Sequence, residues 1–232
     1  GALLTSMYNC ARCCPTRASL LTGLYPHNAG IGHMGANLGT SAYQGFLRSD
    51  SATIAEHLRA SGYRTLMSGK WHVAGDLPAD KIADWRIGAP EHPTPRQRGF
   101  DRFYGIMDGA AHFFSPHCMM EDDTRIHDIP DDFYFTDAIT DKAIDMVEEA
   151  VADETPFFLY LAHTAPHWPL HAPPQDVAKY DGTYRKGWDA IRTARHENMQ
   201  AKGLFQTNWD ISPRDDQVHG WEHEEEPDWE AA

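Results

Sequence analysis

The sequence predicts an α/β domain with buried parallel strands. Residues 53–61 carry apolar side chains at helical spacing, and Gly62 separates them from a short strand-like segment at 63–67. Residues 136–151 show a second amphipathic helical pattern, and the apolar run 156–162 after them has the length of a buried parallel strand. A hydrophobic content of 41% over 232 residues is enough for one sizeable core.

The segment 13–23, with the sequence CCPTRASLLTG, predicts an oxyanion site at the start of a helix. Pro15 stands where a helix begins, and Gly23 ends the helical run. A side chain just before a helix N-terminus, here Cys13, faces unpaired N–H groups and the positive end of the helix dipole, which suit sulfate or phosphate. Arg17, one turn into the helix, adds a planar fork of donors that matches a tetrahedral anion.

The cysteine spacing allows a second interpretation. Cys10-x-x-Cys13 also has the spacing of a thiol redox motif or of half a zinc site. A structural zinc ion needs four ligands, and Cys14 and Cys118 complete that number only if the two adjacent cysteines both bind it. Spacing alone leaves this alternative open.

The segment 62–72, GYRTLMSGKWH, places two further polar side chains after the strand expected at 63–67. Gly69 is expected to open a turn at the carboxyl end of that strand, where ligands bind in open α/β sheets. Lys70 and His72 are two residues apart, so an extended backbone directs them to the same side. The alternative is an ordinary loop without a function.

Two further histidines are candidates in predicted loops. His167 follows the apolar run 156–162 in the turn Ala-Pro-His, and an imidazole with a pKa near neutrality suits a general acid. His33 belongs to the glycine-rich loop 24–45 and is a candidate for substrate contact. For both, the alternative is a surface histidine without a function.

The three segments together resemble the signatures of type I sulfatases, which are Cys-x-Pro-Ser/Thr-Arg, a stretch from Gly-Tyr to Gly-Lys-aromatic-His, and Ala-Pro-His after a strand. The resemblance implies an alkaline-phosphatase-like fold, in which a mostly parallel sheet is flanked by helices, here truncated at both ends. It also implies that a formylglycine-generating enzyme oxidises Cys13, and not Cys14, to formylglycine. The hydrate of that aldehyde would attack sulfur in a sulfate ester.

The resemblance assigns a role to each candidate side chain. Arg17 and Lys70 would stabilise the transferring sulfate, and His72 would orient a hydroxyl of residue 13. His167 would protonate the departing alcohol, and the substrate would also contact Lys70, His167 and His33. A divalent cation, Ca²⁺ or another, would bind residue 13 as formylglycine together with carboxylate and amide ligands from outside these residues.

The expected reaction is hydrolysis of a small-molecule or glycan sulfate ester. Two alternatives stay open: a phosphonate monoester or phosphodiester hydrolase of the same superfamily, and a non-catalytic protein that binds sulfate or glycans. The resemblance predicts a partial sulfatase catalytic domain at 1–207 and a loosely ordered acidic segment at 208–232 that leads to a missing C-terminal part. We expect these 232 residues to be inactive on their own.

Charge and hydropathy narrow the range of partners. The net charge of −14 argues against nucleic acid or an anionic membrane surface as a partner. The excess is uneven, because nine acidic residues and one basic residue fall within 210–232. No segment approaches the ~18 consecutive apolar residues of a membrane span. The sequence gives no indication of the cellular compartment.

Overall fold

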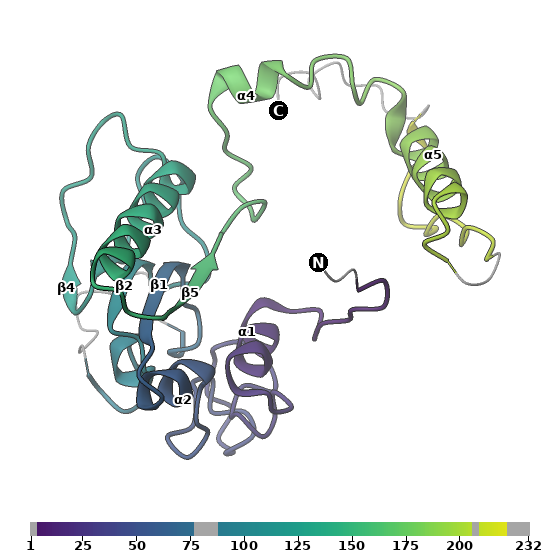
Figure 1. Ribbon diagram of the computed structural model, residues 1–232. Coiled ribbons are helices and arrows are strands. Elements are labelled where there is room, and N and C mark those ends of the chain that lie inside the picture. Colours follow the sequence, from purple (N-terminus) through teal and green to yellow (C-terminus); the bar gives the residue numbers. More distant parts are fainter. Residues whose placement is uncertain (1–3, 77–87, 206–208, 222–232) are drawn as a thin grey trace. The chain divides into compact units, whose positions relative to one another are not determined.

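The computed structural model describes residues 4–76, 88–205 and 209–221 (Figure 1). Two compact units divide the chain. The unit Asn9–His171 contains the sheet and the candidate site, and the other unit combines residues 4–8 with the described residues after 171. The predicted boundary between 1–207 and 208–232 falls outside the described residues, so that division stays a prediction.

The sheet of the larger unit has five strands in the order β4-β3-β2-β1-β5. The central strand β1 (Arg64–Lys70) pairs in parallel with β2 (Arg102–Ile106) and with β5 (Phe157–Ala162). Two short strands, β3 (Met119–Glu121) and β4 (Thr124–Arg125), continue the sheet in antiparallel fashion beyond β2. The expected parallel pairing is therefore confirmed for the three longest strands, and β3 and β4 make the sheet mixed.

Helices pack on both faces of this sheet. Leu66 points to the face covered by α3 (Phe135–Ala152), and the next residue, Met67, shares a core with α1 (Cys13–Thr22) and α2 (Ile54–Ala60). Side chains alternate between the faces of a strand, so one apolar run serves both cores. Figure 1 shows α3 lying across its side of the sheet. The flanked α/β architecture expected from the sequence is confirmed.

Helix α1 begins at Cys13, two residues before the predicted start. Arg12 is the N-cap residue, and Pro15 lies in the first turn. The N–H groups of a first turn have no partner within the helix, so a proline there removes no helical hydrogen bond. At the other end Gly23 adopts the left-handed conformation with φ of 70° and donates its N–H to the carbonyl of Ser19 at 2.8 Å. Cys13 therefore lies within the first turn of the helix.

Helix α2 is capped at its amino end by Thr53 and Glu56. The Thr53 hydroxyl accepts the N–H of Glu56 at 3.1 Å, and the Glu56 carboxylate accepts the N–H of Thr53 at 2.7 Å. Arg98 in the short 3₁₀ helix η2 (Arg96–Arg98) forms an ion pair with Glu56 at 2.9 Å. This pair joins α2 to the segment that leads into β2.

The prediction of a turn at Gly69 is wrong, because β1 continues to Lys70. Gly69 pairs with Gly105 on β2 and with Ala162 on β5. A Cβ on Gly69 would lie 2.2 Å from the carbonyl oxygen of Ala162, so the close approach of β5 requires glycine there. The strand therefore carries Lys70 to the carboxyl edge of the sheet without an intervening turn.

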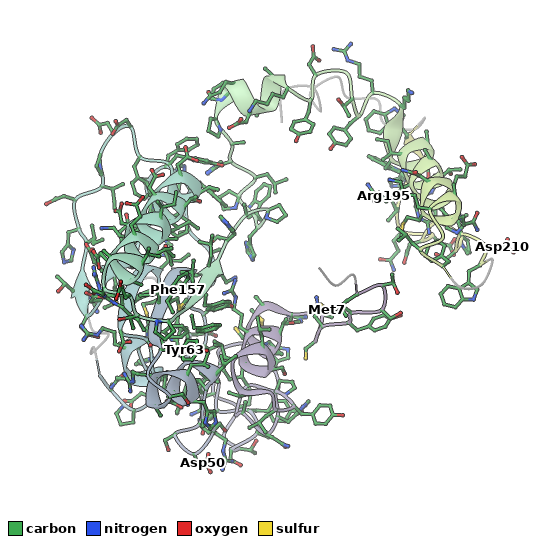
Figure 2. All side chains as sticks on the ribbon, in the orientation of Figure 1. Met7, Asp50, Tyr63, Phe157, Arg195 and Asp210 are labelled. Carbon is green, nitrogen blue, oxygen red and sulfur yellow. The ribbon has the colours of Figure 1, made fainter. Side chains whose placement is uncertain are left out.

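Strand β5 is parallel as expected but is not fully buried among the described residues. It pairs on one side only, with β1, and its middle residues are half-buried. Phe157 is 38% exposed at its amino end, and Figure 2 labels it near Tyr63, which precedes β1. The burial expected from the apolar run was wrong because β5 is an edge strand of the described sheet.

The smaller unit contains α4 (Pro174–Ala178) and α5 (Gly187–Ala201). Helix α5 is mostly exposed or half-buried, and its one buried residue is Gly187. Across both units, no described helix is long and apolar enough to cross a membrane.

Candidate active site

The structure brings four of the six candidate residues together at the carboxyl end of β1. Cys13 and Arg17 lie four residues apart in α1, on the same side of the helix. Lys70 is the last residue of β1, and His72 follows two positions later. Residues 53 or more positions apart in the sequence thus meet because α1 packs on the sheet face that contains Met67.

Cys13 lies at the edge of the buried face of α1. Its neighbour Cys14 is fully buried in the core with Ala18, whereas Cys13 is half-buried. The Cys13 Sγ atom lies 4.0 Å from the thioether sulfur of Met34, in the loop that follows α1. Cys13 is a free thiol, so it remains open to chemical modification.

Arg17 connects the helix to two strands. Its Nη1 atom donates to the main-chain oxygen of Lys70 at 2.5 Å and to the hydroxyl of Tyr160 on β5 at 3.1 Å. Among the described residues both contacts use Nη1, which leaves Nη2 and Nε for another acceptor. The guanidinium is therefore held in place by one nitrogen while its other donors have no partner among the described residues.

Lys70 is a buried cation with only 2% of its surface exposed. Burial lowers the pKa of its ammonium group, and the neighbouring charge of Arg17 lowers it further. Two cationic side chains that lie together away from water repel each other unless an anion joins them. The pair is therefore a strong candidate for binding a tetrahedral anion.

His72 lies beside the two cysteines of the helix start. Its Nε2 atom is 3.2 Å from the Cys14 sulfur, and the ligand atoms of Cys13, Cys14 and His72 all lie within 4.8 Å of one another. Burial, followed by the charge of Lys70, lowers the pKa of His72 to about 3, so the ring is neutral at pH 7. Its Nδ1 atom is buried without a hydrogen-bond partner among the described residues.

The backbone around His72 is specialised for this position. His72 has φ of 56°, in the left-handed region that few non-glycine residues occupy. The ring packs on Gly109, where a Cβ would lie 2.4 Å from two of its atoms. Sequence reasoning did not identify Gly109, because nothing in a single Asp-Gly-Ala turn indicates which ring it will contact.

The four cysteines do not form the zinc site that the Cys10-x-x-Cys13 spacing allowed. The Cys10 sulfur lies 3.6 Å from the hydroxyl of Ser19, and the donor group around Cys13 contains Cys14 and His72 instead of Cys10. Cys118 belongs to a different group of side chains. The four-cysteine interpretation is therefore wrong for the described structure.

His167 lies in an exposed turn after β5. Its main-chain N–H donates to the carbonyl of Thr164 at 2.9 Å, and its Nδ1 atom is 2.6 Å from the carbonyl oxygen of Trp168. A carbonyl only accepts, so Nδ1 carries the ring proton and the neutral ring presents Nε2 as an acceptor. A positive charge on His167 would lower the pKa of His72, although the two rings share no hydrogen bond in the described structure.

His33 and Met34 occupy neighbouring positions in the loop after α1 but differ in environment. His33 is exposed, and its charge acts on Asp76, whereas Met34 is half-buried against Cys13. Met34 and Tyr160 are site residues that sequence reasoning missed. Tyr160 alternates with apolar neighbours along β5, and only its contact with Arg17 distinguishes it from a core residue.

Comparison with known proteins decides the family. A family model described as Sulfatase matches residues 1–218. This chain belongs to the sulfatase family. It is 31% identical over 238 residues to an uncharacterised sulfatase of Schizosaccharomyces pombe, an alignment that covers 93% of this chain and 40% of the relative. It is also 31% identical over 218 residues to an arylsulfatase of Klebsiella aerogenes, with 88% of this chain and 44% of the relative covered.

A solved structure supports the fold of this sulfatase chain. Ps i-CgsB in complex with k-i-k-neocarrahexaose is 29% identical and matches with a TM-score of 0.56 over 72% of this chain and 38% of that one. The chain therefore spans less than half the length of each of these relatives.

The described residues around Cys13 do not fit a calcium ion by themselves. The donor group there consists of two thiols and one imidazole, with no carboxylate. Ca²⁺ takes about six to eight oxygen ligands. Residue 13 could supply an oxygen ligand only after its conversion to formylglycine.

Proposed function

We propose that this chain forms the nucleophile-bearing part of an enzyme that hydrolyses sulfate esters. The observation that carries the proposal is the pair of buried or anchored cations, Lys70 and Arg17, beside the half-buried Cys13. Such a pair binds a tetrahedral anion and places it against residue 13. Family membership supports the same reaction.

Arg17 and Lys70 are the groups that hold the sulfate. The Lys70 carbonyl and the Tyr160 hydroxyl fix Arg17 before any substrate arrives. Donors that are already oriented need not reorganise when charge develops on the transferring oxygens. Lys70 contributes a positive charge, and its burial makes the attraction between this charge and the sulfate stronger than it would be in water.

Cys13 is the cysteine suited to become formylglycine. The hydrate of formylglycine supplies one hydroxyl as nucleophile and a second that later expels the sulfate. Cys14 is enclosed in the core, and burial together with the neighbouring Cys13 raises the pKa of its thiol to about 12. Its sulfur contacts His72, so modification there would disrupt the packing of α1.

His72 is proposed to orient a hydroxyl of residue 13, and His167 is proposed to donate a proton. A neutral His72 ring with an unpartnered Nδ1 is ready to hold a hydroxyl of residue 13 in one orientation. His167 keeps Nδ1 on the Trp168 carbonyl, which leaves Nε2 for the leaving alcohol. A protonated Nε2 would then donate to the departing oxygen as the ester bond breaks.

The substrate is proposed to be a small-molecule or glycan sulfate ester, with exposed His33 as a further contact. The relative Ps i-CgsB with its bound neocarrahexaose supports a carbohydrate as the alcohol half. We also propose that a divalent cation, Ca²⁺ in the first instance, binds formylglycine 13 together with oxygen ligands that the described residues around Cys13 do not provide.

The test uses the whole protein that contains this chain, produced together with a formylglycine-generating enzyme. Mass spectrometry of the peptide that contains both cysteines should show the aldehyde on residue 13 and an unmodified Cys14. The same sample should turn over an aryl sulfate faster than an aryl phosphonate, Cys13→Ala should be inactive, and Cys14→Ser should stay largely active. Active protein with an unmodified Cys13 would overturn the proposal, and a preference for the phosphonate would assign it to the related phosphonate hydrolases.

A further inference from the structure

The pairing of β2 with β3 brings together three side chains of types that can bind a metal ion. The proposed reaction uses none of them. Ile106 at the end of β2 pairs with Met119 at the start of β3. The next step of the pairing is a hydrogen bond of 3.3 Å from the Met107 N–H to the Cys118 carbonyl. Continuing this register places Asp108 opposite His117, the residue next to Cys118.

The ligand atoms of Asp108, His117 and Cys118 all lie within 4.8 Å of one another. The Asp108 Oδ2 atom is 3.3 Å from the His117 Nε2 atom, and Oδ1 accepts the N–H of Gly109 at 2.5 Å, which fixes the carboxylate. Cys118 is half-buried, with φ of 56°, and His117 is exposed. The group is therefore accessible from solvent through His117, and a backbone hydrogen bond holds its carboxylate.

We propose that Asp108, His117 and Cys118 bind one transition-metal ion of the Zn²⁺ class. One carboxylate, one imidazole and one thiolate form a donor set that suits Zn²⁺ and related ions, and Ca²⁺ does not use thiolate. Bonds of about 2.0–2.3 Å to a tetrahedral ion place ligand atoms roughly 3.3–3.8 Å apart. The Asp108–His117 distance already meets this value, and Cys118 has to approach by about 1.5 Å at most.

The proposed metal site and the candidate active site consist of different residues. The group around Cys13 consists of Cys14 and His72 with residue 13 itself, and it shares no member with Asp108, His117 and Cys118. The two groups are nevertheless neighbours, because Gly109 packs on the ring of His72. Three protein ligands leave the fourth position of a tetrahedral ion open to solvent or to a small ligand.

Cobalt is the probe that reports thiolate binding directly, since a Co²⁺–thiolate bond gives a charge-transfer absorption in the near ultraviolet. We would titrate the metal-stripped chain with Co²⁺ in the presence of excess Ca²⁺, and we expect the band to saturate at one equivalent. Cys118→Ser should abolish the band, and His117→Ala should weaken Co²⁺ binding at least tenfold. The matched controls are Cys10→Ser and His112→Ala, which change an exposed thiol and an exposed imidazole outside the group and should leave the titration unchanged.

A second measurement needs no variant and so does not depend on how a mutant folds. The unsubstituted chain is treated with iodoacetamide with and without Zn²⁺, and peptide mass spectrometry follows each cysteine. Zn²⁺ should slow alkylation of Cys118 at least tenfold and leave the exposed Cys10 unaffected. Equal protection of both cysteines, no protection of Cys118, or a cobalt band that persists in Cys118→Ser would overturn the proposal and leave an ordinary Asp108–His117 hydrogen bond.

Discussion

The guanidinium of Arg17 donates a 2.5 Å hydrogen bond to the main-chain oxygen of Lys70, and this bond ties the second turn of α1 to the last residue of β1. Because the acceptor is a backbone atom, replacing the Lys70 side chain should leave Arg17 in place. Replacing Arg17 removes both a charge and an anchor. The two cations can therefore be tested separately.

Arg17→Lys should lower kcat/KM of the full-length enzyme by about 10²–10³, the loss typical of one preorganised donor. Lysine keeps the charge but cannot reach two acceptors in a fixed plane, so the Lys70 carbonyl and the Tyr160 hydroxyl lose their shared partner. Steady-state kinetics on an aryl sulfate measure the effect. Arg12→Lys, an exposed arginine at the N-cap of the same helix, is the control and should behave as wild type. Equal kinetics for the two variants would show that Arg17 has only a structural role.

Lys70→Met should separate catalysis from stability. The variant removes a buried cation whose pKa is lowered by burial and by Arg17, so the free energy of unfolding without anion should stay the same or rise. The same change should lower kcat/KM by about 10²–10³. Inorganic sulfate should raise the Tm of the wild-type protein more than that of the variant.

Lys142→Met is the matched control for that experiment. Lys142 forms an ion pair of 3.0 Å with Glu121 and should not affect turnover when it is replaced. A Lys70→Met variant with near wild-type kinetics, or with the same sulfate-induced shift in Tm as wild type, would contradict the role assigned to Lys70.

His72 should make the folded protein sensitive to acid. Its pKa falls from an ordinary value of 6.5 to about 3, so between these values the unfolded chain binds a proton that the folded chain does not. The stabilising effect of the neutral ring is therefore complete above pH 6.5 and is lost as the pH falls toward 3. Its slope is up to about 1.4 kcal/mol per pH unit.

The free energy of unfolding of wild type and His72→Asn, measured by urea denaturation from pH 7 to pH 4, checks this expectation. Asparagine tolerates the left-handed backbone at this position, so the comparison isolates the imidazole. The variant should show a shallower loss of stability toward low pH. The exposed His57, changed to asparagine in the same way, provides the control. Parallel curves for wild type and His72→Asn would mean that His72 already titrates near its ordinary pKa.

His167→Ala should affect substrates according to their leaving groups. If Nε2 donates a proton to the alcohol, the loss should be about 10²–10⁴ for a poor leaving group such as an alkyl sulfate, and much smaller for an activated aryl sulfate. His163→Ala, which changes an exposed histidine four residues earlier, should cause no such difference. An equal loss for both substrates would show that His167 positions the sulfate and does not donate a proton.

Several residues of the candidate site could be proposed from the sequence because they belong to short local patterns. Cys13 and Arg17 share one helix turn, and Lys70 and His72 share one strand end, so their spacing along the chain reflects their spacing in the fold. Residues that contact the candidate site from a distant part of the sequence could not be found in this way. Gly109 contacts His72 only because the loop after β2 folds back over the end of β1, and no local pattern records that approach.

By itself, the sequence of this chain predicted three of the helices and most of the strands β1 and β5, which follow from local propensity and periodicity that neighbouring residues decide. The family signatures, and the choice of Cys13 as the cysteine suited for modification, came from the resemblance to sulfatases. Tertiary structure alone decided that Gly69 stays within β1, that Arg17 is anchored by Lys70 and Tyr160, and that Asp108 faces His117 and Cys118. Each of these relationships depends on which strands pair and in which register. That choice is made by the packing of the whole domain and not by any one segment.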